Sequence, residues 1–234
     1  MRDVVKEIKK ELKKNADAKT RESGRRFFKE EVKLYGVRAA AVSKIAREYF
    51  SEVKRMDKKK MFAVCEELFK SGYSEEAWIA AGWVHKYANY EKSDFPVYER
   101  WLDKYIDNWA KCDTFCNHAV GEFVEKYPAY LSKLKIWARS KNLWKRRAAA
   151  VSLIIPAKKG KFLKEIFGIA DILLLDEEDM VQKGYGWMLK EASRKNEKQV
   201  FSYVMEKKKI MPRTALRYAI EKMPENLKKQ AMEK

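Results

Sequence analysis

The sequence contains few cysteines, which can cross-link a chain, and few prolines and glycines, which interrupt regular structure. Among its 234 residues are 3 Cys, 5 Pro and 9 Gly. Three cysteines are too few for a disulfide scaffold and are typical of a reducing compartment, so we predict a cytoplasmic protein. No apolar run approaches the roughly 20 residues that cross a bilayer. The start, MRDVVKEIKKELKKN, is charged throughout and does not resemble an export signal. We therefore expect no membrane partner, although a basic amphipathic start of this kind can also lie on an anionic membrane.

Histidine is scarcer still, since only His85 and His118 occur. The sequence has no GxxxxGK[ST] loop, GxGxxG run, GxSxG elbow or HExxH pair, which disfavours ATP-driven, dinucleotide-dependent and zinc-protease chemistry. Cys112, Cys116 and His118 are close in sequence but supply three metal ligands without a fourth. The alternative is that the two cysteines are small buried hydrophobic residues. We predict no metal and no cofactor.

Positive charge is what the sequence has in excess. Lys and Arg number 52 against 34 Asp and Glu, which gives a formal net charge of +18. Hydrophobic residues make up 46% and aromatic residues 13%, enough apolar material for a folded protein. A polyanion is therefore the first partner to consider.

Apolar residues recur at three- and four-residue spacing almost throughout, which predicts an all-α fold. Examples are the stripe Phe27, Val32 and Tyr35 and the stripe Val42, Ile45, Ala46 and Tyr49. Turn-forming residues divide the chain into roughly a dozen helices of three to four turns. The expected breaks are Asn15 to Thr20, Gly36, Met56 to Asp57, Ser71 to Gly72, Asn89 to Asp94, Asn108 to Asp113, Pro128, Ser140 to Asn142, Pro156, Asp176, Asn196, Pro212 and Pro224.

A weak repeat of small residues behind a basic or aromatic residue runs along alternate helices. The copies begin at Arg38, Trp78, Arg146, Lys183 and Arg213, with a fainter one at Asn117. A period of roughly 30 to 40 residues predicts an α-solenoid of stacked helical hairpins, and we expect one domain over residues 1–234. The alternative is a plain helical bundle with Ala-rich cores. In a curved solenoid the leading residues Arg38, Arg146, Arg147, Lys183 and Arg213 would form a basic trough on the concave face, where nucleic acid could bind.

Two aromatic segments suggest more than packing. Trp109 and Asp113 are four residues apart, so in one helix they would share a face and place an indole beside a carboxylate. The alternative is that Asp113 caps a helix beginning at Thr114 while Trp109 fills the core. Trp187 lies in GYGWMLK, where two helical glycines cost about 1 kcal/mol each relative to Ala. We expect those glycines to permit close approach of a neighbouring helix or a ligand.

Four pieces of the sequence together carry a family resemblance. They are YGVRAAAV at Tyr35, NWAKCDTFCNHAVGEFVEKYP at Asn108, LWKRRAAAVSLI at Leu143 and KGYGWMLKEASRKN at Lys183. In order and spacing, from about Arg25 to about Arg217, the chain resembles the AlkD-type DNA glycosylases of the DNA alkylation repair family. The resemblance implies an α-solenoid of HEAT-like repeats that holds duplex DNA and excises cationic alkylpurines such as 7-methylguanine or 3-methyladenine.

The resemblance also implies roles for particular residues. It places the catalytic carboxylate at Asp113, the two aromatic platforms at Trp109 and Trp187, and the supporting arginine at Arg147. Phe27 stands where the family has a tyrosine, and Ala40 and Ser43 stand where it often has proline and arginine. The residues expected to contact DNA are Arg147, Arg146, Phe27, Arg38, Lys44, Lys183 and Lys190.

The sequence thus predicts a monomeric, monofunctional DNA glycosylase whose partner is duplex DNA containing alkylated bases. Alkylation of a purine ring nitrogen makes the base cationic and a good leaving group, so a carboxylate that stabilises the sugar cation and places a water is sufficient. Two alternatives remain open. One is a non-catalytic nucleic-acid-binding protein of the same architecture, and the other is a protein-protein scaffold.

Overall fold

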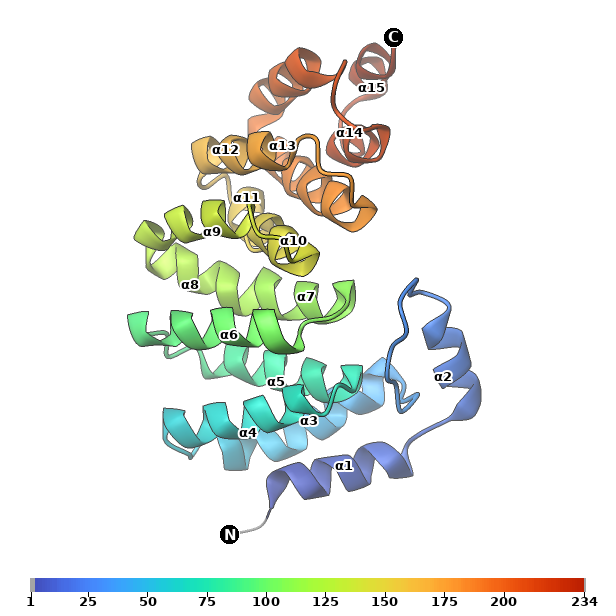
Figure 1. The fold of residues 1–234 in the computed structure, drawn as a ribbon, viewed down its shortest axis with the longest axis vertical. Helices are drawn as coiled ribbons and strands as arrows, with labels where there is room; N and C mark the ends of the chain where they lie inside the picture. Colours follow the sequence, from blue (N-terminus) through green and yellow to red (C-terminus); the bar gives the residue numbers. More distant parts are fainter. Residues whose placement is uncertain (1–2, 234) are drawn as a thin grey trace. The chain divides into compact units, whose positions relative to one another are not determined.

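The computed structural model describes residues 3–233 and contains two compact units, Met1–Phe115 and Cys116–Lys234. Helices make up both units (Figure 1). No β-strand occurs in residues 3–233, where Lys33 and Tyr73 form one isolated parallel bridge. The all-α prediction is confirmed. The expected single domain over residues 1–234 stays a prediction.

The first unit contains one long helical series. Its elements are α1 (Val4–Lys14), α2 (Ala18–Arg25), α3 (Ala39–Val53), α4 (Lys58–Lys70), α5 (Ser74–Tyr87), the 3-10 turn η1 (Lys92–Asp94), α6 (Phe95–Tyr105) and α7 (Trp109–Phe115). Asp3, Asp17 and Asp57 begin α1, α2 and α4, and each carboxylate accepts a backbone N–H three residues on. These aspartates satisfy donors that a helix start leaves unpaired, which is why the breaks fall where the sequence places them.

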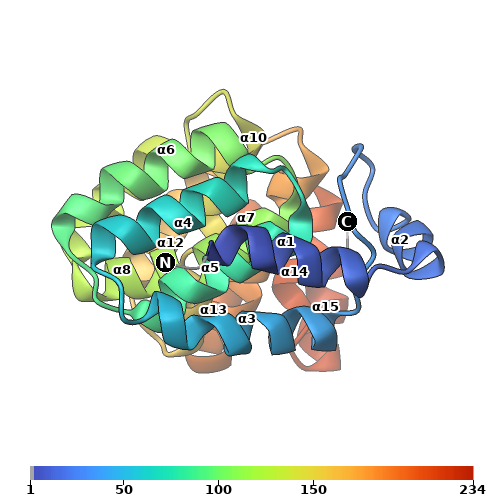
Figure 2. The ribbon, with the colours of Figure 1, turned by 90° about the horizontal axis from the view of Figure 1, so that it is seen from below.

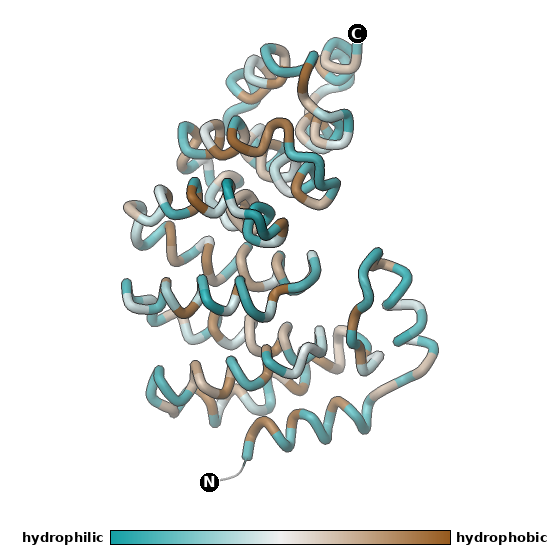
Figure 3. The backbone as a smooth tube through the Cα atoms, in the orientation of Figure 1, coloured by the Kyte–Doolittle hydropathy of each residue, from teal (hydrophilic) through white to brown (hydrophobic). Residues whose placement is uncertain are grey.

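Helices of the first unit stack as hairpins. α4 packs against α5, and each helix also contacts the one two places along: α3 with α5, α4 with α6, and α5 with α7. Figures 1 and 2 show α4 and α6 on one side of this unit and α3 on the other. The core between them is aromatic, with Trp83 and Trp101 fully buried. Figure 3 shows the apolar positions recurring along each helix, as the spacing in the sequence requires.

Residues 26–38 correct one sequence prediction. The spacing of Phe27, Val32 and Tyr35 predicts a helix, but this segment is irregular apart from its bridge at Lys33. The buried Glu75 carboxylate at the start of α5 accepts the backbone N–H groups of Tyr35 (3.2 Å), Gly36 (2.9 Å) and Val37 (3.2 Å). Those amides are paired without a helix. The distant Glu75 carboxylate therefore stabilises an irregular segment where the local apolar spacing predicts a helix.

The second unit continues the same architecture. Its elements are the π-helix η2 (Cys116–Val120), α8 (Gly121–Lys126), the 3-10 turn η3 (Pro128–Tyr130), α9 (Leu131–Trp137), α10 (Leu143–Val151), α11 (Ile154–Lys158), α12 (Leu163–Leu173), α13 (Asp179–Lys207), α14 (Arg213–Ile220) and α15 (Glu225–Met232). α9 packs on α10 and α12, α10 on α13, and α13 on α14. Hairpin stacking, the local signature of an α-solenoid, is therefore present within each unit.

Small residues let these helices approach closely. Ala148, Ala149 and Ala150 are fully buried on α10, which packs on α13. A Cβ at Gly186 of α13 would lie 2.8 Å from the backbone oxygen of Ala215 on α14. The prediction that a helical glycine near Trp187 serves close approach is confirmed.

Two helix breaks that the sequence predicts in the second unit have different outcomes in the structure. Asn196 has non-helical angles (φ −134°, ψ 47°) inside α13, so the expected break is confirmed as a kink. The sequence predicts another break at Pro156, but this residue lies in the first turn of α11. Proline is tolerated there because the first helical N–H groups have no partner inside the helix.

None of the helices within residues 3–233 combines the length and hydropathy needed to cross a membrane. In the same residues, no group of three His, Cys, Asp or Glu side chains is arranged to hold a metal ion. Cys112 and Cys116 are both fully buried, as expected for small hydrophobic residues at helical spacing.

Candidate functional site

Helix α7 carries both Trp109 and Asp113. Asn108 precedes the helix, and its Oδ1 accepts the backbone N–H of Lys111 at 3.0 Å, so the cap is Asn108 rather than Asp113. The alternative in which Asp113 caps a helix at Thr114 is therefore wrong. Trp109 and Asp113 are separated by one turn, and both are partly exposed. An indole and a carboxylate consequently share one face of α7.

A buried lysine fixes the start of α7. Lys111 is 1% exposed, and its Nζ donates to the Gly72 carbonyl at 2.9 Å and lies 2.8 Å from an Asp107 carboxylate oxygen. A buried cation is stable only when it is paired and hydrogen-bonded. These contacts attach α7 to the turn between α4 and α5 and restrict movement of the face that carries Trp109.

The Trp109 indole is held from outside its own helix. Its Nε1 donates to the Phe27 carbonyl at 3.3 Å, and the Phe28 ring stacks on it with centroids 5.3 Å apart and planes 22° apart. The sequence did not indicate a role for Phe28, because the family resemblance concerns only the neighbouring Phe27. The Phe27 side chain is 72% exposed. The two adjacent phenylalanines thus differ, since Phe28 supports the indole and Phe27 presents its ring to solvent.

The segment bearing these phenylalanines is itself anchored on α5. Besides the three amides that Glu75 accepts, the Tyr35 hydroxyl donates to Glu76 at 2.7 Å, and the Tyr35 ring stacks on Tyr73 with centroids 4.0 Å apart. Burial raises the pKa of the Glu76 carboxyl, and burial together with the Glu76 contact raises the pKa of the Tyr35 hydroxyl. Both pKa shifts follow from the enclosed position of the anchor.

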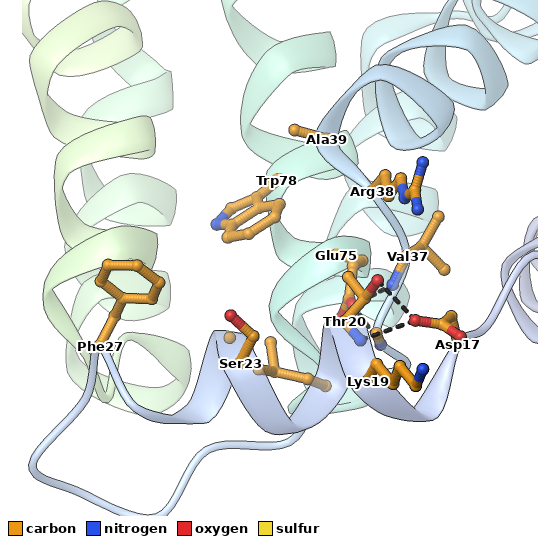
Figure 4. Close-up of a pocket in the computed structure, with 13 residues that line it drawn as sticks. Asp17, Lys19, Thr20, Ser23, Phe27, Val37, Arg38, Ala39, Glu75 and Trp78 are labelled. Atoms are coloured by element: carbon orange, nitrogen blue, oxygen red, sulfur yellow. Dashed lines mark hydrogen bonds between the residues drawn. The ribbon is translucent and has the colours of Figure 1, made fainter.

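The same segment forms one wall of a cavity of about 640 Å³ in the first unit. Figure 4 shows Phe27 and Trp78 at one end of this cavity and Arg38 at the other. Arg38 is exposed at the residue preceding α3, and Lys44 is exposed on α3 itself. The sequence-predicted residues Phe27, Arg38 and Trp109 therefore belong to one neighbourhood built around the 26–38 segment.

In the second unit, Arg147 is a buried side chain of α10. It is 5% exposed, and its guanidinium donates to the Met180 carbonyl. A Cβ at Gly184 would lie 3.3 Å from Arg147 Cγ, so Gly184 makes room for this arginine beside α13. Trp187 follows on α13 and is partly exposed. The glycine-rich start of α13 thus serves both Arg147 and the packing near Trp187.

The other predicted cations of this unit already have partners. Arg146 donates four hydrogen bonds, two to the Asp176 carboxylate (2.6 and 3.1 Å) and two to the carbonyls of Ser140 and Lys141. That arrangement ties together two interhelical turns and gives Arg146 a structural role. Among the lysines, Lys183 pairs with Asp179 at 2.8 Å and Lys190 with Glu221 at 2.9 Å. A phosphate that binds either lysine must compete with a carboxylate.

The fold and these residues define an all-α protein of stacked helical hairpins that carries partly exposed indoles, a carboxylate and an excess of cations. The sequence model of the DNA alkylation repair enzyme family matches residues 8–223, and the chain belongs to this family. The resemblance noted in the sequence is confirmed at this level. No curated protein matches the sequence.

A solved structure described as a predicted DNA alkylation repair enzyme from Enterococcus faecalis is similar in fold. The TM-score is 0.81, and the match covers 90% of this chain and 98% of that chain at 16% identity. At that identity the likeness establishes the shared all-α fold.

Proposed function

We propose that the protein is a monofunctional DNA glycosylase that hydrolyses the N-glycosidic bond of positively charged alkylpurines, such as 7-methylguanine and 3-methyladenine, in duplex DNA. Membership of the DNA alkylation repair family supports a role in alkylation repair. The observation that carries the proposal is the Trp109 and Asp113 pair on one face of α7, with the indole fixed by Phe28. We propose that it acts as a cytoplasmic monomer without a cofactor.

The chemistry needs little beyond this pair. The alkylated base is already cationic, so it leaves without strong general-acid help, and positive charge develops on the sugar as the bond breaks. The Asp113 carboxylate stabilises that charge and positions the attacking water. The Trp109 face attracts the cationic nucleotide with about 0.5 to 2 kcal/mol. On the family resemblance, Trp187 is proposed as a second aromatic platform and Arg147 as an arginine that binds DNA.

DNA binding is proposed to use several cations. Arg38 and Lys44 are exposed, while Lys183 and Lys190 exchange carboxylate partners for phosphates. For each phosphate contacted, the slope of log affinity against log salt concentration becomes more negative by about 0.9. Affinity for plain duplex should therefore fall steeply with salt. A flat salt response would contradict the electrostatic part of the proposal.

The decisive experiment compares wild type with Asp113→Asn on duplex that contains 7-methylguanine. Excision should collapse while duplex affinity is retained, and Asp103→Asn, which changes an exposed aspartate on α6, should leave both unchanged. Binding without release by wild type would favour the non-catalytic alternative. Absence of duplex binding at moderate salt would favour the protein-protein scaffold.

A further inference from the structure

The cavity beside the 26–38 segment has the size of a ligand site. Its volume of about 640 Å³ falls within the roughly 300 to 1,000 Å³ typical of small-molecule sites. α2, the 26–38 segment and the first turns of α3 and α5 form its walls (Figure 4). All of them belong to the first unit, and the segment is the one whose Phe28 stacks on Trp109.

Both carboxylates in the cavity wall are already engaged. Glu75 accepts the three successive amides described above. Asp17 accepts the Thr20 backbone N–H and the Thr20 hydroxyl, each at 2.7 Å, and these hydrogen bonds lower the pKa of the Asp17 carboxyl. The Asp17 carboxylate keeps its charge, and Arg38 lies near enough for its charge to help lower the pKa of that carboxyl. Lys19 and Arg38 are both exposed, and they are the groups of the wall that can meet an anionic part of a ligand.

The other available surface is aromatic. Phe27 is 72% exposed, although the segment that carries it is anchored to Glu75. Trp78 lines the same cavity, and its buried Nε1 has no hydrogen-bond partner among the described residues. Because that nitrogen is buried, Trp78 offers a ligand its ring and not its N–H group. A flat ligand would lie against the exposed Phe27 ring and the Trp78 ring.

We propose that this cavity binds one unpaired nucleotide of DNA, with the base against Phe27 and Trp78 and the phosphate near Lys19 and Arg38. Aromatic faces that stack on a base beside cations that meet its phosphate are the usual means of binding single-stranded nucleic acid. The proposal rests on the proposed function, because it takes DNA as the ligand. It adds a subsite that holds a nucleotide displaced from the duplex near Trp109.

The test uses three fluorescein-labelled duplexes of equal length without any alkylated base. One is fully paired, one carries a single unpaired thymidine, and one carries an abasic residue at the same bulge. Wild type should bind the thymidine bulge about tenfold more tightly than the abasic bulge, because stacking requires the base. The abasic duplex controls for the bending that any bulge permits. Equal affinity for the two bulges would overturn the proposal.

Variants test which side chains produce the preference for the thymidine bulge. Phe27→Ala and Trp78→Leu should each lower the preference for the base to about twofold or less, whereas Trp78→Phe should retain most of it. Ile136→Ala, which removes another exposed apolar side chain (59% exposed), should retain it fully. If Trp78→Leu fails to fold by circular dichroism, Phe27→Ala decides the question, since an exposed ring contributes little to folding. A preference that survives Phe27→Ala would overturn the proposal.

Release of 7-methylguanine is measured separately, so the two proposals fail independently. A preference for the thymidine bulge without release of 7-methylguanine would contradict the proposed glycosylase activity and support the nucleotide subsite. Release by wild type without a preference for the thymidine bulge would contradict the nucleotide subsite and support the proposed glycosylase activity. Asp113→Asn should keep the preference, because Asp113 does not line the cavity.

Discussion

The Phe28 ring lies on the Trp109 indole, with centroids 5.3 Å apart and planes 22° apart. This contact joins α7 to a segment more than 80 residues earlier, since Trp109 Nε1 also donates to the Phe27 carbonyl across 82 positions. The Trp109 indole is thereby held in place by residues of its own unit. A prepositioned platform loses less freedom on binding and keeps the geometry that catalysis requires.

Removal of the Phe28 ring should therefore impair excision more than binding. We expect Phe28→Ala to lower the single-turnover rate of 7-methylguanine release about tenfold or more, while duplex affinity stays within about twofold. Phe28→Tyr keeps the stacking surface and should behave like wild type. A Phe28→Ala rate within twofold of wild type would show that the indole does not depend on this support.

Loss of the Glu75 charge should loosen the segment that carries Phe28. Glu75→Gln weakens three charge-assisted hydrogen bonds to buried amides and should lower the free energy of unfolding by about 2 to 3 kcal/mol. Trypsin should then cleave faster at Lys29 and Lys33. Glu67→Gln, which alters an exposed carboxylate on α4, should change neither stability nor cleavage. Unaltered cleavage in Glu75→Gln would contradict the anchoring role.

Two glycines in helices should respond oppositely to alanine. At Gly186 the added Cβ would lie 2.7 Å from Tyr218 Cβ and 2.8 Å from the Ala215 oxygen, so Gly186→Ala should destabilise by about 1 to 3 kcal/mol. A Cβ added at Gly82 of α5 would meet nothing within 4 Å beyond its chain neighbours and the backbone of its own helix. Gly82→Ala should therefore stabilise by up to about 1 kcal/mol. Urea denaturation of both variants checks the difference in sign.

In the proposed DNA complex, Glu221 would compete with a DNA phosphate for Lys190. Lys190 Nζ lies 2.9 Å from Glu221 and 5.6 Å from the Tyr218 ring centroid, and the hydrogen bond from Lys190 lowers the pKa of the Glu221 carboxyl. Glu221→Gln should strengthen duplex binding about two- to fivefold and steepen the salt dependence by about one phosphate contact. Glu225→Gln removes the same charge from an exposed carboxylate of α15 and should have a smaller effect. Equal effects would indicate net charge alone.

The features that could be predicted from the sequence are those fixed by nearby residues. The helical spacing and the break at Asn196 follow from local chemistry. The two glycines before Trp187 predicted a close approach, but only the fold shows that α14 is the neighbour at Gly186. The irregular 26–38 segment could not be predicted, because its amides are paired by Glu75, which is 40 residues from Tyr35. The Phe28 contact and the fixed position of Arg146 against Asp176 likewise depend on residues brought together by folding.

For the candidate site, family resemblance and geometry contribute different parts. The resemblance assigned Asp113, Trp109, Trp187 and Arg147. The structure resolved whether Asp113 is a helix cap, since Asn108 takes that position. It also added Phe28, which no motif in the sequence distinguished from core aromatic residues, and it placed Trp78, the first residue of one repeat copy, in the wall of a cavity.

The most direct test of the proposed activity is single-turnover release of 7-methylguanine by wild type and Asp113→Asn, with duplex affinity measured in parallel. We predict release by wild type, loss of about a hundredfold or more in Asp113→Asn, and affinities that agree within about twofold. Release by Asp113→Asn at a rate within a few-fold of wild type would contradict the assignment of the catalytic carboxylate.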